Sequence, residues 1–237
     1  MKHILASVMI FLGGANLPAT GQSIIDGLNA YNAGNYIAAY ENFKPLAEQG
    51  DADAQTNLGV MYEYGEGVLQ DYAEAVKWYR LAAEQELAEA QYNLGRMYQS
   101  GNGVLQDDAE AVNWYRLAAN QGNVSAQYNL GLLYNYGDSV LQDYAEAVKW
   151  FQLAAQQGDA DAQYYLGVMY WVGKGAPRNY VKAHMWADIS AANGGDASLR
   201  DEIVLNMTSA EIVEAERLAR KCMASDYQDC DLSLRVL

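Results

Sequence analysis

The sequence predicts an all-α solenoid, a stack of helical hairpins built from one repeated unit. A shift of 36 residues aligns four glycines, Gly59, Gly95, Gly131 and Gly167. The same shift aligns four tryptophans, Trp78, Trp114, Trp150 and Trp186. Between residues 54–85 and 90–121, 24 of 32 positions are identical, far more than chance allows. A fixed period in the thirties is typical of repeats that bury their apolar faces only against their neighbours.

Each repeat contains the pattern of two helices. In the first repeat, residues 53–64 place apolar side chains on one helical face. Two glycines within residues 65–67 end this helix, because glycine disfavours continued helix. Asp71, with Glu74 three residues later, predicts the start of the second helix in an Asp-x-x-Glu capping box. The same pair recurs as Asp107 with Glu110 and as Asp143 with Glu146.

The glycines fall into two groups with different predicted roles. Gly59 and its three counterparts lie inside the first helix, where glycine costs about 1 kcal/mol relative to alanine. Their retention predicts that the paired helix passes too close to leave room for a Cβ. A second group follows the helix ends, where glycine can adopt the left-handed cap conformation. Its members are Gly50, Gly122, Gly158 and Gly194.

Several motifs resemble the Sel1-like repeat, a relative of the tetratricopeptide repeat with a longer loop inside each hairpin. They include Ala-Gln-Tyr-Asn-Leu-Gly, Gly-x-Gly-Val and Leu-Ala-Ala-x-Gln-Gly. The resemblance covers residues 51–194 and implies repeats at 51–86, 87–122, 123–158 and 159–194. It implies a right-handed α-solenoid of antiparallel hairpins that binds other molecules. The loops depart from the pattern: the usual proline occurs only as Pro177, and leucine replaces it at Leu69, Leu105 and Leu141.

The two ends of the repeat array differ from its middle. Residues 22–50 predict a capping hairpin of tetratricopeptide type, because its loop is five residues shorter than those that follow. Residues 195–237 predict C-terminal capping helices, the first over 197–206 and the second opened by Thr208 and Glu211. Terminal units of solenoids are atypical because one of their faces meets water.

Residues 1–21 have the pattern of a signal peptide. Lys2 and His3 precede a short apolar run, and small residues follow it. Cleavage after Gly21 or after Ala19 fits the pattern, and a buried first helix is the alternative. The apolar run is too short to span a bilayer as a helix. We therefore expect an exported protein, periplasmic or secreted, with no transmembrane segment once the signal is removed.

The charge of the chain limits its partners. Lys and Arg number 15 against 30 Asp and Glu, a formal net charge of −15 at pH 7. Such an acidic surface repels phosphate backbones and anionic membranes. Nucleic acid is therefore a poor partner, whereas a neutral or basic protein or peptide is compatible. Solubility alone is the alternative explanation of the charge.

No set of residues in the sequence indicates catalysis, and none indicates a metal or a cofactor. Apart from His3, the only histidine is His184, at the position of three valines on a predicted core face. A packed, hydrogen-bonded histidine explains it. One histidine and two cysteines do not make a zinc site. A hydrolase acting on cell-envelope or antibiotic substrates and a structural spacer in an envelope assembly remain alternatives to a binding scaffold.

The candidate binding residues are those at which near-identical repeats disagree. Within the first helix, residues 54–85 and 90–121 differ at four positions with the spacing i, i+4, i+7 and i+8, which form one stripe. The resemblance places this stripe in a concave groove, and Tyr, Trp and Arg dominate binding at interfaces. We predict that the stripe is separate from the packing face. The predicted groove residues are Tyr92, Arg96, Gln99, Tyr128, Asn135, Tyr136, Tyr164 and Trp171.

The sequence contains two cysteines, Cys222 and Cys230. In a chain expected to reach an oxidising compartment, an even number of cysteines favours a disulfide. A separation of eight residues allows the bridge if the segment folds over. The bridge would pin the tail over the end of the last helix. Metal binding is the rival interpretation, and the lack of a nearby histidine disfavours it.

Overall fold

The computed structural model describes residues 23–230, and within this range the chain forms twelve helices and no strand. The N-terminal hairpin consists of α1 (Ile24–Asn32) and α2 (Tyr36–Glu48). Four further hairpins follow: α3 (Ala52–Tyr64) with α4 (Tyr72–Ala83), α5 (Ala88–Ser100) with α6 (Asp108–Asn120), α7 (Val124–Tyr136) with α8 (Tyr144–Ala155), and α9 (Ala160–Val172) with α10 (Tyr180–Ala192). The chain ends with the short α11 (Ser198–Val204) and with α12 (Ser209–Ala224). The predicted signal peptide, residues 1–21, lies outside the described residues.

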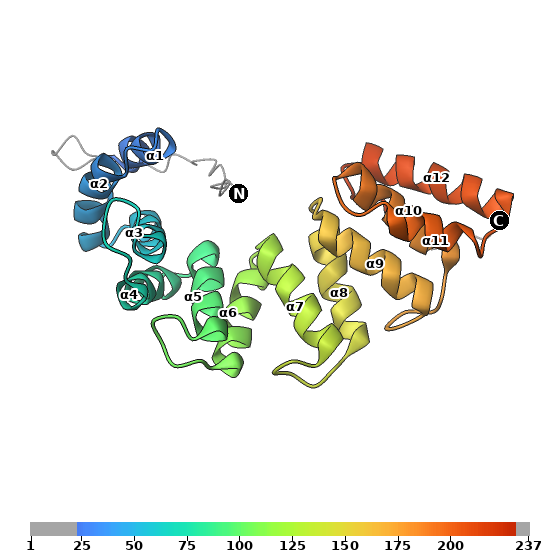
Figure 1. Cartoon of the computed structure of the whole chain (residues 1–237), viewed down its shortest axis with the longest axis horizontal. Coiled ribbons are helices and arrows are strands. Elements are labelled where there is room, and N and C mark those ends of the chain that lie inside the picture. The colour runs from blue at the N-terminus through green and yellow to red at the C-terminus, as the bar shows by residue number, and fades with distance from the viewer. Residues whose placement is uncertain (1–22, 231–237) are drawn as a thin grey trace.

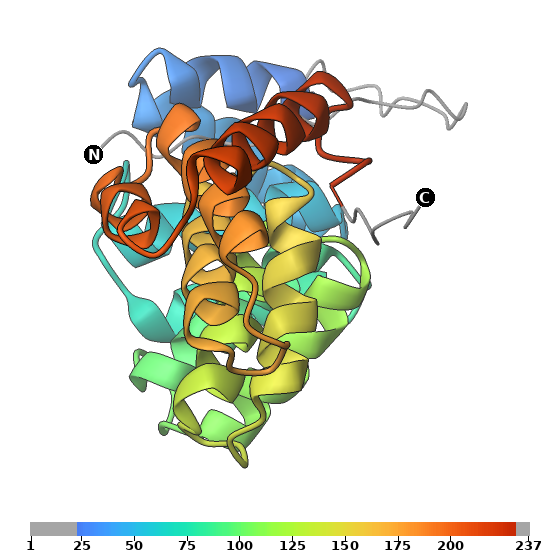
Figure 2. The same cartoon turned by 90° about the vertical axis from the view of Figure 1, so that its right-hand side faces the viewer.

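The hairpins stack into an arc, with α1 and α12 at its two ends (Figure 1). In the view turned by 90°, α1 runs across the picture whereas the yellow α8 runs up it (Figure 2). The helix direction therefore rotates along the stack. This is the all-α solenoid of stacked hairpins that the sequence predicts.

Side chains cap most of the helices, as the sequence indicates. The carboxylates of Asp71, Asp107 and Asp143 each accept hydrogen bonds from two backbone N–H groups in the first turn of a second helix. The reciprocal half of the predicted capping boxes is not formed there: Glu74 binds Lys77, and Glu146 binds Lys149. The complete capping box occurs at Thr208 and Glu211, where it was predicted.

The glycines inside the first helices lie against an aromatic ring of the second helix. A Cβ added to Gly59 would lie 2.6 Å from the Tyr79 ring, and one added to Gly95 would lie 2.8 Å from the Tyr115 ring. At Gly131 the ring is that of Phe151, at 2.5 Å. Real Cβ atoms do not approach other atoms so closely, so the predicted close approach is confirmed in these three repeats. The predicted left-handed conformation is also confirmed, since φ is +88° to +96° at Gly50, Gly122, Gly158 and Gly194.

The tryptophans connect each repeat to the one before it. Trp78 of α4 packs in the apolar cluster of α1, α2 and α3. Trp114 of α6 packs against the cluster of α4 and α5, and Trp150 of α8 against that of α6 and α7. Trp186 of α10 is buried in the cluster that α8 and α9 supply. The tryptophan series therefore holds adjacent hairpins together.

A series of buried glutamines also connects neighbouring repeats, and the sequence analysis missed it. Gln55 donates from Nε2 to the carbonyl oxygen of Ala47 in the preceding hairpin, at 3.0 Å. Its Oε1 accepts a hydrogen bond of 2.8 Å from Nε2 of Gln85. Buried amides need such partners, because an unsatisfied polar group costs about 1–3 kcal/mol. The arrangement recurs at Gln91, Gln127 and Gln163.

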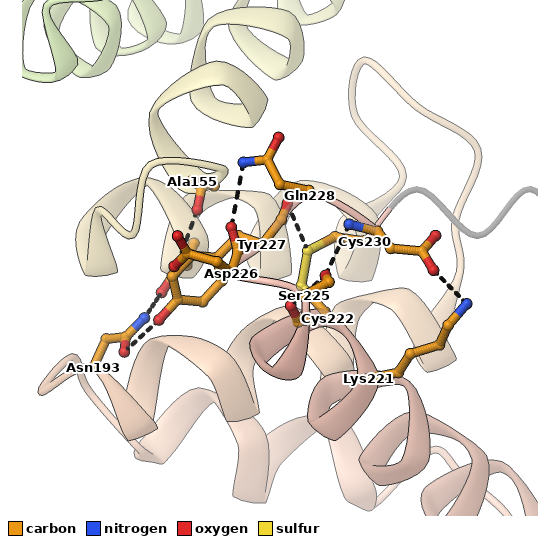
Figure 3. The surroundings of a disulfide bond; sticks show 11 residues. Ala155, Asn193, Lys221, Cys222, Ser225, Asp226, Tyr227, Gln228 and Cys230 are labelled. Atoms are coloured by element: carbon orange, nitrogen blue, oxygen red, sulfur yellow. Dashed lines mark hydrogen bonds and ion pairs between the residues drawn. A yellow bond between two sulfur atoms is a disulfide. The ribbon is translucent and has the colours of Figure 1, made fainter.

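The C-terminal segment folds back over the end of the stack. Cys222 and Cys230 are joined by a disulfide, with a Cα–Cα distance of 4.6 Å. Between them, the hydroxyl of Tyr227 donates to Oδ1 of Asn193 at the end of α10 (Figure 3). Lys221 forms an ion pair with Asp229, at 2.5 Å. The bridge and these contacts hold residues 225–230 against α8 and α10.

We expect Gly95→Ala to destabilise the protein by about 1–3 kcal/mol, because the added methyl group overpacks against the Tyr115 ring. Gly167→Ala is the matched control, since its added Cβ would meet the flexible end of Leu199 at 3.1 Å. We expect this control to cost less, because the end of the Leu199 side chain can move aside whereas the buried Tyr115 ring cannot. The gain of about 1 kcal/mol in helix propensity is common to both variants. Urea unfolding measures both values. Equal losses in the two variants would contradict the proposed role of the ring.

We expect the double variant Cys222→Ala/Cys230→Ala to lose about 2–3 kcal/mol of stability, the chain-entropy value for so short a loop. Thermal melting with and without reductant gives the comparison. Reductant should lower the melting temperature of the wild type and leave that of the double variant unchanged. Alkylation of the protein purified without reductant, followed by mass spectrometry, should find no free thiol. Two labelled thiols would contradict the bridge.

Candidate binding surface

The predicted groove residues lie on three consecutive first helices of the arc (Figure 1). Tyr92, Arg96 and Gln99 are on α5; Tyr128, Asn135 and Tyr136 are on α7; Tyr164 and Trp171 are on α9. Gln99 and Tyr136 are exposed, whereas the other six are half-buried. The stripe is therefore partly a surface and partly a packing layer.

Two groove tyrosines pack on the rings that cover the helix glycines. The ring centroids of Tyr92 and Tyr115 lie 5.8 Å apart, and those of Tyr128 and Phe151 lie 6.0 Å apart. The equivalent residue of α3, Thr56, is buried. The prediction that the stripe is separate from the packing face is therefore wrong. It fails because the aromatic ring of the second helix reaches the first helix from the side on which the stripe lies.

The structure adds Tyr165 to this surface. Its ring stacks on Phe151 at 4.9 Å, and its hydroxyl lies 3.1 Å from that of Tyr136. Tyr128 and Tyr164 also contact it edge-on or tilted, with centroids about 6 Å away. The signal was present in the sequence, because the other three repeats carry asparagine at this position.

Tyrosine hydroxyl groups are protonated at neutral pH, and burial makes the ionisation of these ones still less favourable. Burial raises the pKa of Tyr128 to about 12, and the negative charges of Asp161 and Asp159 add to the effect. Burial also raises the pKa of Tyr165, as does the hydrogen bond to Tyr136. The tyrosines therefore offer neutral O–H groups and ring faces to a partner.

Arg96 is engaged within the protein. Its Nη2 lies 2.6 Å from Oε1 of Glu63 on the preceding first helix. The other carboxylate oxygen of Glu63, which is 5% exposed, accepts a hydrogen bond of 2.7 Å from the Tyr79 hydroxyl. The guanidinium carbon of Arg96 also lies 5.9 Å from the centroid of the Tyr92 ring. Arg96 therefore connects α3 to α5, and it is not a free charge for a partner.

Glu63, Gln99 and Asn135 occupy the same position in three successive repeats. The residue type at this position changes with the aromatic ring that faces it. Tyr115 donates its hydroxyl to Oε1 of Gln99 at 2.7 Å, as Tyr79 does to Glu63. The third repeat has Phe151, which has no hydroxyl, and its counterpart residue is Asn135. The side chain of Gln99 is therefore partly committed to the fold, and that of Asn135 is not held by a ring hydroxyl.

In the fourth repeat, α11 supplies the side chain that packs on the helix glycine. At the position of Tyr79, Tyr115 and Phe151 this repeat carries Ala187, and Leu199 of α11 approaches Gly167 instead. Leu199 and Ile203 form an apolar cluster with α10, and the half-buried Tyr164 and Trp171 pack against it. Both residues were predicted as groove residues. Part of the surface of each is covered by the C-terminal cap.

Acidic side chains crowd the start of the first helices. Burial raises the pKa of Glu89, and the nearby negative charge of Asp53 raises it further. Burial also raises the pKa of Asp53, with a smaller contribution from Asp51. A raised carboxylate pKa means that the ionised form is disfavoured in the folded protein. A cationic group of a partner would relieve this crowding.

His184 lies in the core of α10, at 2% exposure. Its Nδ1 lies 3.3 Å from an oxygen of Asp188, but this contact lacks hydrogen-bond geometry. The packed position was predicted, whereas the predicted hydrogen bond is not made at Nδ1. Among residues 23–230, no group of three or more His, Cys, Asp or Glu side chains is arranged to hold a metal ion. Within the same range, no helix is long and apolar enough to cross a membrane.

Comparison with protein families gives four matches to the Sel1 repeat model, at residues 52–87, 88–123, 124–159 and 160–195. These boundaries lie one residue later than the predicted ones. A putative sel1-like repeat-containing protein of Acanthamoeba polyphaga mimivirus is 46% identical over 48 residues, which is 20% of this chain and 8% of that protein.

Two solved structures are similar over most of the chain. A Sel1 repeat protein from Oxalobacter formigenes is 33% identical, with a TM-score of 0.71 over 84% of each chain. A protective antigen of uropathogenic Escherichia coli strains, which displays an SLR fold, is 34% identical with a TM-score of 0.70. That match covers 87% of this chain and 50% of the antigen, so the present chain spans about half of that relative.

We expect Arg96→Leu to cost about 1.5–3 kcal/mol, because it leaves the buried Glu63 carboxylate without its charged partner. The double variant Glu63→Gln/Arg96→Leu reproduces the pair found one repeat later, Gln99 with Leu132. We expect it to recover most of the loss. Urea unfolding of the single and double variants tests the coupling. A double variant as unstable as the single one would show that the ion pair is not the source of the effect.

Proposed function

The chain belongs to the family of Sel1 repeat proteins, and on this premise we propose that it is an exported, non-enzymatic scaffold that binds a protein or peptide. The proposed binding surface is the stripe of the first helices α5, α7 and the start of α9. The proposed partner is neutral or basic. The observation that carries the proposal is the layer of packed tyrosines on these helices.

The tyrosines favour binding because they are already held in place. Tyr92, Tyr128 and Tyr165 each contact a further aromatic ring, so little side-chain entropy is lost when a partner covers them. Tyr136 is 56% exposed, and its hydroxyl is close to that of Tyr165. Aromatic side chains on a rigid support are typical of the residues that dominate interface energies.

The packing of α11 narrows the proposed groove. Tyr164 and Trp171 contact the cluster that contains Leu199 and Ile203, so they offer less free surface than the sequence suggested. Arg96 is paired with Glu63. The residues that we assign to the partner are therefore Tyr92, Gln99, Tyr128, Asn135, Tyr136 and Tyr165.

Charge supports a neutral or basic partner. The whole chain carries a formal net charge of −15. Burial raises the pKa of Glu89 at the start of α5, and the negative charge of Asp53 raises it further. A cationic partner would gain from this potential, particularly at low salt. Export rests on the pattern of residues 1–21 and is consistent with the disulfide between Cys222 and Cys230.

Selection from a random peptide library against the chain without residues 1–21 tests the proposal. We expect the selected peptides to be rich in Lys or Arg, and Tyr136→Ala to weaken their binding by about tenfold or more. Leu117→Ala is the matched control, because Leu117 of α6 is also an exposed apolar residue, at 47%, and lies outside the stripe. Both variants should melt like the wild type. Peptides that bind Tyr136→Ala as well as the wild type would refute the groove.

A further inference from the structure

A second surface of interest is a cleft between α4 and α6. It has a volume of about 490 Å³. The loop between α5 and α6 closes one side of it, running below α4 on the outside of the arc (Figure 1). This loop is held close to α4, since a Cβ added to Gly103 would clash with the backbone of Tyr72. The residues that line the cleft include Glu84, Leu105, Glu110 and Trp114.

The walls of the cleft combine carboxylates with an indole ring. Glu84 and Glu110 make no side-chain hydrogen bond or ion pair with the rest of residues 23–230. Asp107, a third carboxylate, caps α6. The one cation in the lining, Arg80, donates to the hydroxyl of Tyr98 at 2.7 Å. With three carboxylates against one guanidinium, the lining of the cleft remains net negative beside the half-buried Trp114.

The first and third repeats, called the sister repeats below, show which group contacts the glutamate equivalent to Glu110. In the first repeat, Nζ of Lys77 lies 3.0 Å from Glu74 and 5.1 Å from the centroid of the Trp78 ring. In the third repeat, Nζ of Lys149 lies 2.6 Å from Glu146. The second repeat has the same glutamate and tryptophan, Glu110 and Trp114, but asparagine replaces the lysine at position 113. An ammonium group is thus the internal partner of this glutamate in both sister repeats, and the second repeat lacks it.

An exposed leucine stands next to the carboxylates. Leu105 is 90% exposed, and its counterparts Leu69 and Leu141 are exposed to 90% and 91%. The neighbouring Val104 packs inward. At this exposure Leu105 contributes little to the core, and an apolar contact with a partner would bury it. The cleft therefore suits a cationic side chain that is flanked by apolar residues.

We propose that this cleft binds a lysine or arginine side chain of a partner protein, with its charge between Glu84, Glu110 and the Trp114 ring. Leu105 contacts an apolar residue beside that side chain. The partner supplies from outside the cation that Lys77 and Lys149 supply within their own repeats. A cation gains both from the carboxylates and from the face of the indole ring. This surface is separate from the proposed groove, and neither proposal depends on the other.

The test uses the blocked tripeptide Leu-Lys-Leu as a probe of the folded chain without residues 1–21. The indole N–H resonances of the five tryptophans are followed by NMR during titration, and the Trp114→Phe variant assigns the relevant signal. We expect the Trp114 signal to shift and the blocked tripeptide Leu-Glu-Leu to leave it unchanged. Asn113→Lys fills the site from within, and we expect it to weaken binding about fivefold.

The sister repeat offers the reverse experiment. Lys77→Asn should expose Glu74 and Trp78, so that the probe now also shifts the Trp78 signal. Ser125→Lys is the matched control, because it adds the same charge at an exposed position on α7 and should leave binding at Trp114 unchanged. Equal binding by Asn113→Lys and wild type, or an equal shift with the Glu tripeptide, would overturn the proposal. So would a change of oligomeric state in Asn113→Lys, which would make the cleft a contact between copies.

Discussion

The contact between a glycine of the first helix and an aromatic ring of the second sets the geometry of each hairpin. Because Gly59 has no Cβ, the ring of Tyr79 lies directly on the helix backbone. The two helices of the hairpin can then approach closely. Where the ring is missing, at Ala187, the chain inserts Leu199 from an additional helix. The C-terminal cap therefore satisfies the same packing requirement as the repeats.

This contact also shapes the surface of the first helices. The rings that cover the glycines extend far enough to pack against Tyr92 and Tyr128, so the groove is built on the core and not beside it. The hydroxyl groups of Tyr79 and Tyr115 require hydrogen-bond acceptors, which Glu63 and Gln99 provide. The residues of the stripe are therefore constrained by the ring beneath them. In our proposal they are also selected by the partner that binds above them.

The two proposed surfaces arise from differences between nearly identical copies. A repeat array provides its own reference, because a residue that changes in one copy is seen against the same surroundings in the others. Asn113 replaces a lysine that pairs with a glutamate in two other repeats, as Lys77 and Lys149 show. Tyr165 replaces an asparagine that the other three repeats have at this position. Each change leaves the fold intact and alters what its surface can bind.

The period, the two helices of each repeat, their caps and the glycines that admit a close neighbour could all be predicted from the sequence alone. These features depend on residues near one another in the chain or on exact repetition, both of which are visible in one dimension. Which side of the first helix is free depends on contacts between distant parts of the chain, and these are visible only in the folded protein. Arg96 forms an ion pair with Glu63, and Trp171 packs against the cluster that contains Leu199. Each contact joins residues about 30 positions apart in the chain. Helical spacing identifies residues that share a face, but it does not reveal which other helix covers that face. In this protein the aromatic rings of the second helices and the short helix α11 cover part of it.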